Sequence, residues 1–300
     1  MEYTYIDPLY DIGFKLLLGR ENVSEEVLMN FLNAVFAGDP ELSCIVHLRY
    51  LNTEHHGDWK DAKGIRYDIM CETGTGHRFI VEMQKAPQEN FVKRGIYYVC
   101  RGIAEQGFRG INEDELSWEY DVTPVIGVFL CNFHVPTLPY KTLTRARIIE
   151  EETSKPVGDL MRMVFIQLPS FEKREEECES EFDQWIYNLK NMGQKQAVAF
   201  QNRNDIFRRV ANIGRLANLS PEERRDYETE IKYARDTFNQ IKFAMKEGLE
   251  KGRAEGRAEG RAEGELLGIE KTAKNMKRRG YSVEDIQAIT GLDIKRIELL

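Results

Sequence analysis

The sequence has few of the features that mark secreted or membrane-spanning proteins. Only 5 of its 300 residues are cysteine, and no two of them form a Cys-x-x-Cys pair. This excludes a disulfide scaffold and gives no pattern for a zinc site, so we expect reduced thiols. No uninterrupted apolar run reaches the roughly 18 residues of a membrane span, and the N-terminus lacks the basic and apolar regions of a signal peptide. We therefore expect a cytoplasmic protein that does not contact a membrane.

Positive charge is also scarce, above all in the first half. The chain has 42 Lys+Arg and 50 Asp+Glu, a net charge of -8. Residues 1–150 carry 15 and 22 of these, hence -7, whereas residues 151–300 carry 27 and 28, hence -1. A net negative charge in this half is not typical of a protein that binds nucleic acid by electrostatic attraction alone. If this half acts on DNA, metal ions have to offset carboxylates at its site.

Hydrophobic periodicity divides the chain into a mixed α/β part and a helical part. The expected elements are helices over 11–18, 24–37 and 89–106, and strands over 43–51, 65–73, 77–84 and 122–133, followed by two further strands. From Phe171 onward the apolar spacing is almost purely helical. We expect a mixed α/β domain over 1–170, a helical domain over 171–250, a repeat over 251–270, and a small helical end over 271–300.

The repeat is Gly-Arg-Ala-Glu, which occurs three times from Gly252. Glycine costs about 1 kcal/mol in a helix interior, so the segment is predicted to be a marginal helix by itself. Two parallel helices that meet at the glycines would set Arg opposite Glu on both sides, whereas an antiparallel pair would set like charges together. The segment therefore either pairs in parallel with a second copy or forms a solvated, partly frayed linker.

The end of the chain combines a basic run with a helix-turn-helix-like pattern. Five basic residues between Lys271 and Arg279 have no acid among them, and Ser282 is a plausible cap for the helix that follows. A solvated basic face is the simpler interpretation, and we favour it over sequence-specific DNA reading.

A hairpin at residues 65–84 brings two carboxylates together. If its loop is Gly74-Thr75-Gly76, Thr73 pairs with His77, and Asp68 falls directly opposite Glu82. Like charges directly opposite across two strands are destabilising. A hard divalent cation held by one or two carboxylates, with water and substrate phosphate, would relieve this repulsion. The alternative is that both acids are solvated on an exposed face, and a register slip of one residue would part them.

The alternation of side chains along these strands sorts the neighbouring residues. Gln84 lies on the same face as the two acids. Residues 69, 71, 81 and 83 point to the other face, into a core. Lys85 also points to that opposite face.

Four segments in order resemble the PD-(D/E)XK nuclease superfamily, and more closely the Rpn family of recombination-promoting nucleases, often labelled transposases. They are Asp-Ile-Gly-Phe-Lys at 11–15, Tyr-Asp-Ile at 67–69, Val-Glu-Met-Gln at 81–84 and Arg-Gly-Ile-Tyr-Tyr at 94–98. The likeness continues into the helical half and covers nearly the whole chain. It implies an α/β fold with a restriction-endonuclease-like core, a mixed sheet flanked by helices, followed by an all-helical C-terminal region.

The resemblance also implies a chemistry. Asp68 and Glu82 would ligate Mg2+, or Mn2+ in its place, with the Met83 carbonyl as a further ligand, and Asp11 matches an acidic position of the first helix. The metal would lower the pKa of a bound water and stabilise charge on a DNA phosphodiester. The implied protein is a bacterial metal-dependent DNA endonuclease linked to recombination, mobile elements or phage defence.

Gln84 departs from the wider superfamily, where Lys is usual, although Gln is common in this family. Gln orients a water but carries no charge. Lys15 could supply that charge from the first helix, or it is a surface lysine. Arg94 and Tyr98 share one helical face and either contact a phosphate or tie the helix to the sheet. Tyr97 is expected in the core.

Two other functions remain open at this point. The protein could be an inactive or weak nuclease-fold module that self-associates through its helical half and repeat. It could also be a DNA-binding regulator that acts through residues 271–300.

Overall fold

The structure is a computed structural model that describes residues 4–55, 64–107 and 122–300. Contacts divide the chain into two compact units, Met1–Ile231 and Lys232–Leu300, and each is described by itself. Within the described residues, no helix is both long and apolar enough to cross a bilayer.

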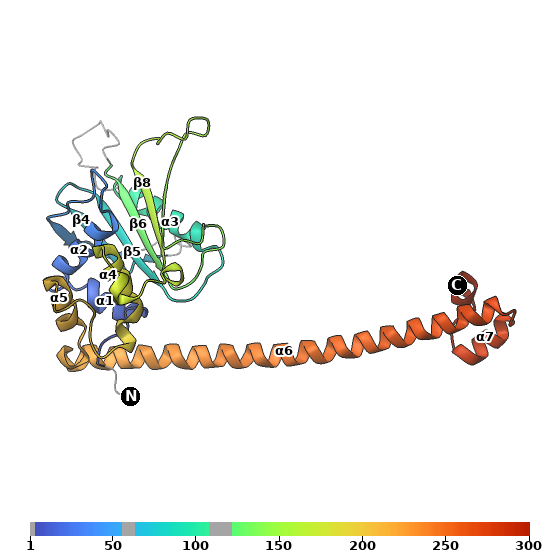
Figure 1. Ribbon diagram of the computed structural model, residues 1–300. Helices are drawn as coiled ribbons and strands as arrows, with labels where there is room; N and C mark the ends of the chain where they lie inside the picture. The colour runs from blue at the N-terminus through green and yellow to red at the C-terminus, as the bar shows by residue number, and fades with distance from the viewer. Residues whose placement is uncertain (1–3, 56–63, 108–121) are drawn as a thin grey trace. The chain divides into compact units, whose positions relative to one another are not determined.

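The first unit is built on a mixed sheet of six strands in the order β1-β4-β5-β6-β8-β7 (Figure 1). The strands are β1 Leu48–Tyr50, β4 Ile69–Thr73, β5 Arg78–Gln84, β6 Val125–Cys131, β7 Leu143–Arg147 and β8 Met161–Gln167. The pairs β5–β6 and β6–β8 are parallel, and the others are antiparallel. Two short strands, β2 Glu54–His55 and β3 Ile65–Arg66, pair apart from this sheet.

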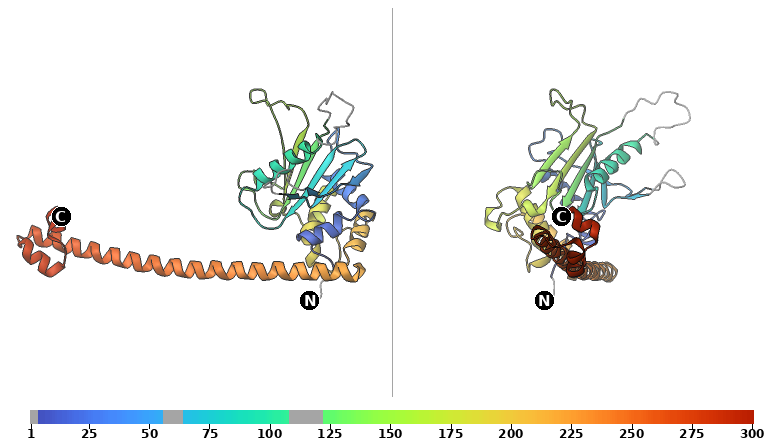
Figure 2. Two further views of the ribbon diagram at one scale, coloured as in Figure 1. Left: turned by 180° about the vertical axis from the view of Figure 1, so that it is seen from behind. Right: turned by 90° about the vertical axis from the view of Figure 1, so that its right-hand side faces the viewer.

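Helices cover both faces of the sheet (Figure 2). They are α1 Asp11–Leu18, α2 Glu25–Val35, α3 Phe91–Ala104, α4 Glu181–Asn191 and α5 Asp205–Gly214. Helix α3 packs on β6 and β8, while α1 contacts β5 and the helices α1, α2, α4 and α5 contact one another. The predicted order of helix, strands, helix and strand is confirmed, and the six central strands match the mixed α/β fold that we expected.

Two separate hydrophobic cores follow from this arrangement, one on each face. On the α3 face, Tyr67, Met70 and Ile80 pack with Phe91 and Val99 of α3. The other core contains the residues that alternation along the strands placed on the opposite face, namely Ile69, Cys71, Val81 and Met83, with side chains of α1 and α2. That part of the prediction is confirmed. Because both faces are covered, a polar side chain near the middle of this sheet, such as Glu82, is buried.

Helices α4 and α5 belong to the same compact unit as the sheet, and the division between the two units falls after Ile231 and not at residue 170. Trp185 of α4 is fully buried, with its ring 5.4 Å from Phe31 of α2 and 5.2 Å from Phe207 of α5. Its indole nitrogen donates a hydrogen bond to Asn30 at 2.7 Å. The apolar face of α4 therefore completes the core of the first unit and does not form a core of its own.

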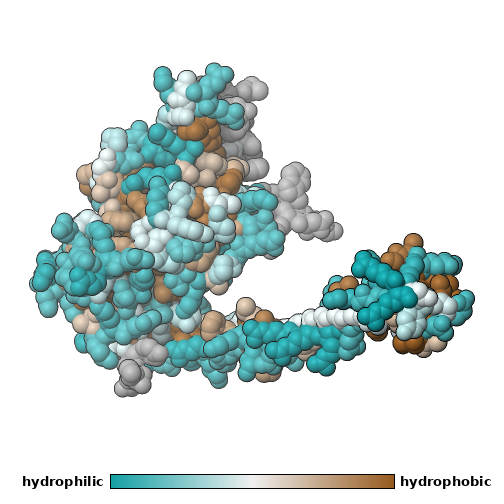
Figure 3. Space-filling model, turned by 45° about the vertical axis from the view of Figure 1, so that its right-hand side comes forward, coloured by the Kyte–Doolittle hydropathy of each residue, from teal (hydrophilic) through white to brown (hydrophobic). Residues whose placement is uncertain are grey.

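Helix α6, Pro221–Arg278, runs without a break through the Gly-Arg-Ala-Glu repeat. We expected a helical domain up to residue 250 and a marginal helix in the repeat after it. Three of every four residues in the repeat are good helix formers, which offsets the cost of the glycines. The charged residues leave much of this helix hydrophilic (Figure 3).

The second unit ends in two short helices, α7 Val283–Thr290 and α8 Ile294–Leu299. A small core of Ala273, Ile286, Leu292 and Ile297 holds them to the end of α6. Lys277 of the basic run donates hydrogen bonds to the Ile297 and Glu298 carbonyls that end α8. The first turn of α7 carries two acids, Glu284 and Asp285, which does not favour contact with a DNA groove.

Candidate metal centre

The candidate site lies where β4 and β5 diverge, at the carboxyl end of β5. The register pairs Ile69 with Val81 and Glu72 with Arg78, and the Thr73 amide donates to His77 at 2.9 Å. Paired residues therefore sum to 150, as the sequence predicted, and the next position along sets Asp68 opposite Glu82. No register slip separates the two acids.

At Asp68 and Glu82, the backbone hydrogen bonds between the strands are replaced by hydrogen bonds that the two carboxylates accept from backbone amides. The Asp68 amide donates to Glu82 Oε1 at 3.0 Å, and the Met83 amide donates to Asp68 Oδ2 at 2.9 Å. Strand β4 begins only at Ile69, because the Tyr67 amide bonds to Thr53 instead. Each strand is thus held by the carboxylate of the other, and this fixes where both carboxylates lie.

Both carboxylates are taken out of water and are short of positive charge. Glu82 is only 6% exposed, and the Asp68 side chain is 14% exposed. Burial, followed by the neighbouring Asp11, raises the pKa of Asp68 to about 7. Burial, followed by the charge of Asp68, raises the pKa of Glu82 to about 8. The pair is electrostatically incomplete, and a cation would relieve it.

Helix α1 brings Asp11 and Lys15 to the same place. Lys15 Nζ lies 2.9 Å from Asp11 Oδ2, one turn earlier, and 3.3 Å from Asp68 Oδ1. Burial lowers the pKa of Lys15, but the two carboxylates outweigh it and raise that pKa overall. Lys15 is therefore an ammonium that contacts both Asp11 and Asp68.

Gln84 and Arg94 form the opposite side of the site. Arg94 Nη2 donates to Gln84 Oε1 at 2.6 Å, its other nitrogen donates to Gln88, and Gln84 Nε2 donates to the Ala86 carbonyl at 3.2 Å. The charge of Arg94 also counteracts the rise in the pKa of Glu82. The tie between helix and sheet that we considered for Arg94 is present. Gln88 was not foreseen, because a loop residue carries no periodic signal.

Two neighbouring tyrosines of α3 differ in their exposure and contacts. The Tyr98 ring lies 5.6 Å from the Arg94 guanidinium carbon, and the Tyr98 carbonyl accepts a hydrogen bond from the Tyr67 hydroxyl. Tyr98 thus packs beside Arg94. Tyr97 is 53% exposed, so the expectation that it belongs to the core is wrong. The helix approaches the sheet closely at Gly95, where a Cβ would lie 3.0 Å from the Phe129 ring, and this turns Tyr97 outward.

The donor set fits a hard divalent cation. Two buried carboxylates converge, and Mg2+ typically takes one or two carboxylates and completes its shell with water and phosphate. In the described parts of the chain, no three His, Cys, Asp or Glu side chains come together as a metal-binding group. Lys85 does not enter the site. Its ammonium lies 3.0 Å from the Tyr10 ring centroid on the other face, as alternation predicted.

A mixed sheet with a helical crossover, and an acidic pair at the end of its central hairpin, define a PD-(D/E)XK nuclease-like fold. The sequence model of the PD-(D/E)XK nuclease family transposase matches residues 8–244, and the chain belongs to that family. No curated protein and no solved structure matches the chain.

Proposed function

We propose that the protein is a metal-dependent endonuclease that hydrolyses phosphodiester bonds of DNA. The observation that carries the proposal is the buried pair of acids, Asp68 opposite Glu82, which hydrogen bonds from the Asp68 and Met83 amides hold together beside Lys15. Perturbed carboxylates that converge beside a lysine are typical of sites that do chemistry. The family supports DNA as the substrate.

In this proposal Asp68, Glu82 and the Met83 carbonyl hold the metal, Mg2+ or Mn2+. A bound divalent cation lowers the pKa of a water and stabilises charge on a scissile phosphate. Asp11 holds Lys15, and Lys15 supplies beside Asp68 the positive charge that Gln84 lacks. Arg94 keeps the Gln84 carbonyl turned toward α3, and Arg94 and Tyr98 border the path of the DNA backbone.

The experiment is cleavage of supercoiled plasmid with Mg2+ or Mn2+, comparing wild type with Asp68→Asn and Glu82→Ala. The wild type nicks the plasmid and both variants lose this activity. Equal cleavage by all three proteins would show that a contaminating nuclease cleaves the plasmid, and it would contradict the proposal. Binding of Mn2+ without cleavage by the wild type would favour an inactive nuclease-fold module. The implied setting is the cytoplasm, in recombination, mobile elements or phage defence.

The proposal includes a homo-oligomer held together by parallel α6 helices. Phe238, Ile241 and Met245 are exposed at heptad spacing. In the repeat, i,i+4 neighbours carry like charges, Arg with Arg and Glu with Glu. Apart from Glu255, which pairs with Lys251 just before the repeat, these charges have no complementary partner at that spacing on their own helix. The repeat has a period of four residues, which is longer than the 3.6 residues of one helical turn, so successive glycines shift by about 40° around the helix axis. Two paired α6 helices must therefore coil around each other to keep their glycines in contact.

Charge exchange in the repeat tests the pairing. Replacing Arg253, Arg257 and Arg261 by Glu separates the subunits in sedimentation. A partner variant with Glu255, Glu259 and Glu263 replaced by Arg restores a mixed pair. A monomeric wild type would rule out this part of the proposal.

A further inference from the structure

Helix α1, which carries Asp11 and Lys15, begins without a cap of its own. Its N-cap residue is Tyr10, whose side chain makes no capping hydrogen bond. Ser, Thr, Asp or Asn at this position would satisfy an amide of the first turn. An uncapped first turn frays easily, yet this one contains Asp11 and lies one turn before Lys15.

The missing acceptor comes from a residue that is 218 positions away. Glu230 Oε1 of α6 accepts a hydrogen bond from the Ile12 amide at 3.1 Å. One turn earlier in α6, the Tyr227 hydroxyl accepts from the Asp7 amide at 2.8 Å. All four residues belong to the first unit, and Figure 1 shows α1 beside the first turns of α6. A carboxylate at this position also complements the dipole of α1.

The chain before α1 has little room to adjust. A Cβ on Gly13 would lie 2.1 Å from the Asp7 carbonyl oxygen, and a Cβ on Gly193 would lie 2.5 Å from the Asp7 Cβ. Asp7 is therefore packed between two glycines while its amide is bound to Tyr227. The position of α1 is set at this turn and at the Glu230 cap.

We propose that Glu230 is a positioning residue for the metal centre. By capping α1 it holds Asp11 and Lys15 against Asp68, with Tyr227 as the second tether. The inference about cleavage rests on the proposed function, whereas the inference about geometry does not.

The first test measures geometry in the full-length protein. The coupling between Lys15 and Asp68 is obtained from a double-mutant cycle of Lys15→Met and Asp68→Asn in urea unfolding. We expect a coupling of about fivefold in the unfolding constant in the wild-type background. It falls to near unity with Glu230→Ala and returns with Glu230→Gln, which keeps the oxygen acceptor. An unchanged coupling in Glu230→Ala would overturn the proposal.

Hydrogen exchange of α1 gives a second, independent readout. The Ile12 amide exchanges about fivefold faster in Glu230→Ala, the effect of losing a typical cap. The matched control is Glu228→Ala on the same helix, because Glu228 is exposed and is bonded to Arg224. Equal exchange in Glu230→Ala and wild type would overturn the cap.

Plasmid cleavage then separates positioning from general stability. Glu230→Ala lowers kcat about tenfold, with little change in KM for DNA, because a small displacement of reacting groups is costly. Glu230→Gln restores the rate. An unchanged kcat, despite faster exchange, would overturn the role in positioning. If the wild type does not cleave, the proposed function fails, and the Lys15–Asp68 coupling still decides whether Glu230 positions α1.

Discussion

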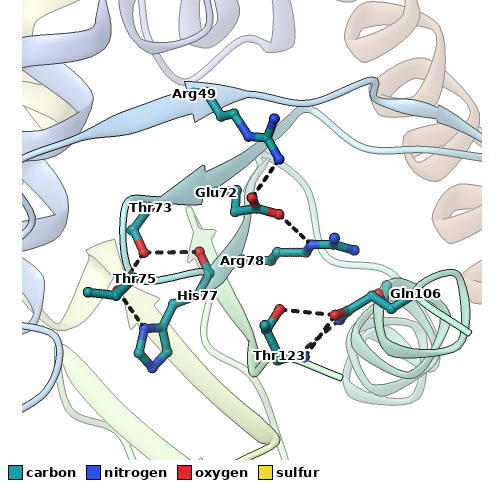
Figure 4. Close-up of polar contacts among 9 residues, drawn as sticks. Arg49, Glu72, Thr73, Thr75, His77, Arg78, Gln106 and Thr123 are labelled. Atoms are coloured by element: carbon teal, nitrogen blue, oxygen red, sulfur yellow. Dashed lines mark hydrogen bonds and ion pairs between the residues drawn. The ribbon is translucent and has the colours of Figure 1, made fainter. Parts of the chain in front are cut away.

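The two ends of the β4–β5 strand pair carry opposite electrostatic arrangements. At the hairpin end, Glu72 lies across from Arg78 and beside Arg49 of β1, at 2.9 Å and 2.6 Å (Figure 4). Burial works to raise the pKa of Glu72, but hydrogen bonds from the two arginines outweigh it and lower that pKa. At the other end, Asp68 faces Glu82 and both pKa values are raised.

The two arrangements share one face of the same two strands. Moving from the hairpin, the facing pairs are Glu72 with Arg78, then Met70 with Ile80, then Asp68 opposite Glu82. In the first pair an acid faces a base, whereas in the last pair two acids face each other. Burial alone therefore does not mark the functional end. The distinguishing property is the absence of sufficient positive charge beside buried acids.

The largest expected effect separates the two ends by activity. Asp68→Asn or Glu82→Gln lowers plasmid cleavage more than about 100-fold, as loss of a main electrostatic group in a catalytic site does. Glu72→Gln leaves cleavage within about twofold but lowers the free energy of unfolding by about 1–2 kcal/mol, because Arg78 loses its partner. Nicking assays and urea unfolding check both. Loss of cleavage in Glu72→Gln would contradict the conclusion that only the Asp68–Glu82 end acts in cleavage.

Metal binding should report only on the acidic end. At a hundredfold excess over Kd, Mn2+ stabilises the folded state by about 2.7 kcal/mol. For a unit of this size that is a rise in Tm of about 5–10 °C, measured by calorimetry. Glu72→Gln keeps the rise, and Asp68→Asn loses it. A similar rise in both variants would place the metal elsewhere.

Lys15 and Lys85 form a matched pair of lysines on opposite faces of the sheet. Lys15→Met lowers the cleavage rate about tenfold, because the positive charge beside Asp68 is lost. Lys85→Met, which removes a contact with the Tyr10 ring and a 4.0 Å ion pair with Asp7 on the other face, leaves the rate unchanged. Initial rates at saturating Mg2+ measure this. Equal rates for the two variants would show that Gln84 acts without help from Lys15.

The smallest effect is the pH dependence of the metal-free protein. An ordinary carboxyl group has a pKa of about 4, whereas the pKa values of Asp68 and Glu82 in the folded state are about 7 and about 8. Between these values the folded state therefore binds more protons than the unfolded chain. The acidic end therefore loses stability as the pH rises through this window. Glu72 has the opposite sign, since its lowered pKa gives stability that is lost only as the pH falls through the acid range.

Urea unfolding in EDTA at pH 5.5 and pH 8.5 measures this difference. Relative to Asp68→Asn, the wild type is less stable at the higher pH, and Mn2+ removes the deficit. A gap between the two proteins that does not change with pH would mean that Asp68 is already charged across the whole range.

Local patterns were sufficient to predict the hairpin and the identity of the acidic pair. A period of two along residues 65–84 and a short glycine-containing loop set the register, and the register sets Asp68 opposite Glu82. The same pattern predicted which side chains enter the core. These features depend on neighbours in the chain, so the sequence alone contains the information.

Contacts between segments that are far apart in the chain could not be predicted from such local patterns. Lys15 beside Asp68, Arg94 on Gln84 and Glu230 on Ile12 each join elements whose relative placement no periodicity encodes. The contacts by which Trp185 completes the core of the first unit, with Phe31 and Phe207, are of the same long-range kind. Tyr97 and Tyr98 are adjacent in sequence, and only the packing of α3 decides which one faces outward.

The sequence by itself determined the order of the elements, the register of the hairpin and the pairing of Asp68 with Glu82, because these follow from side-chain alternation and turn length. The tertiary structure alone decided that both faces of the sheet are covered, so that these acids are buried. It also decided that α1, capped by Glu230, holds Lys15 against Asp68. Burial and long-range charge depend on which surfaces pack together, and that packing makes the end of this hairpin a candidate metal centre.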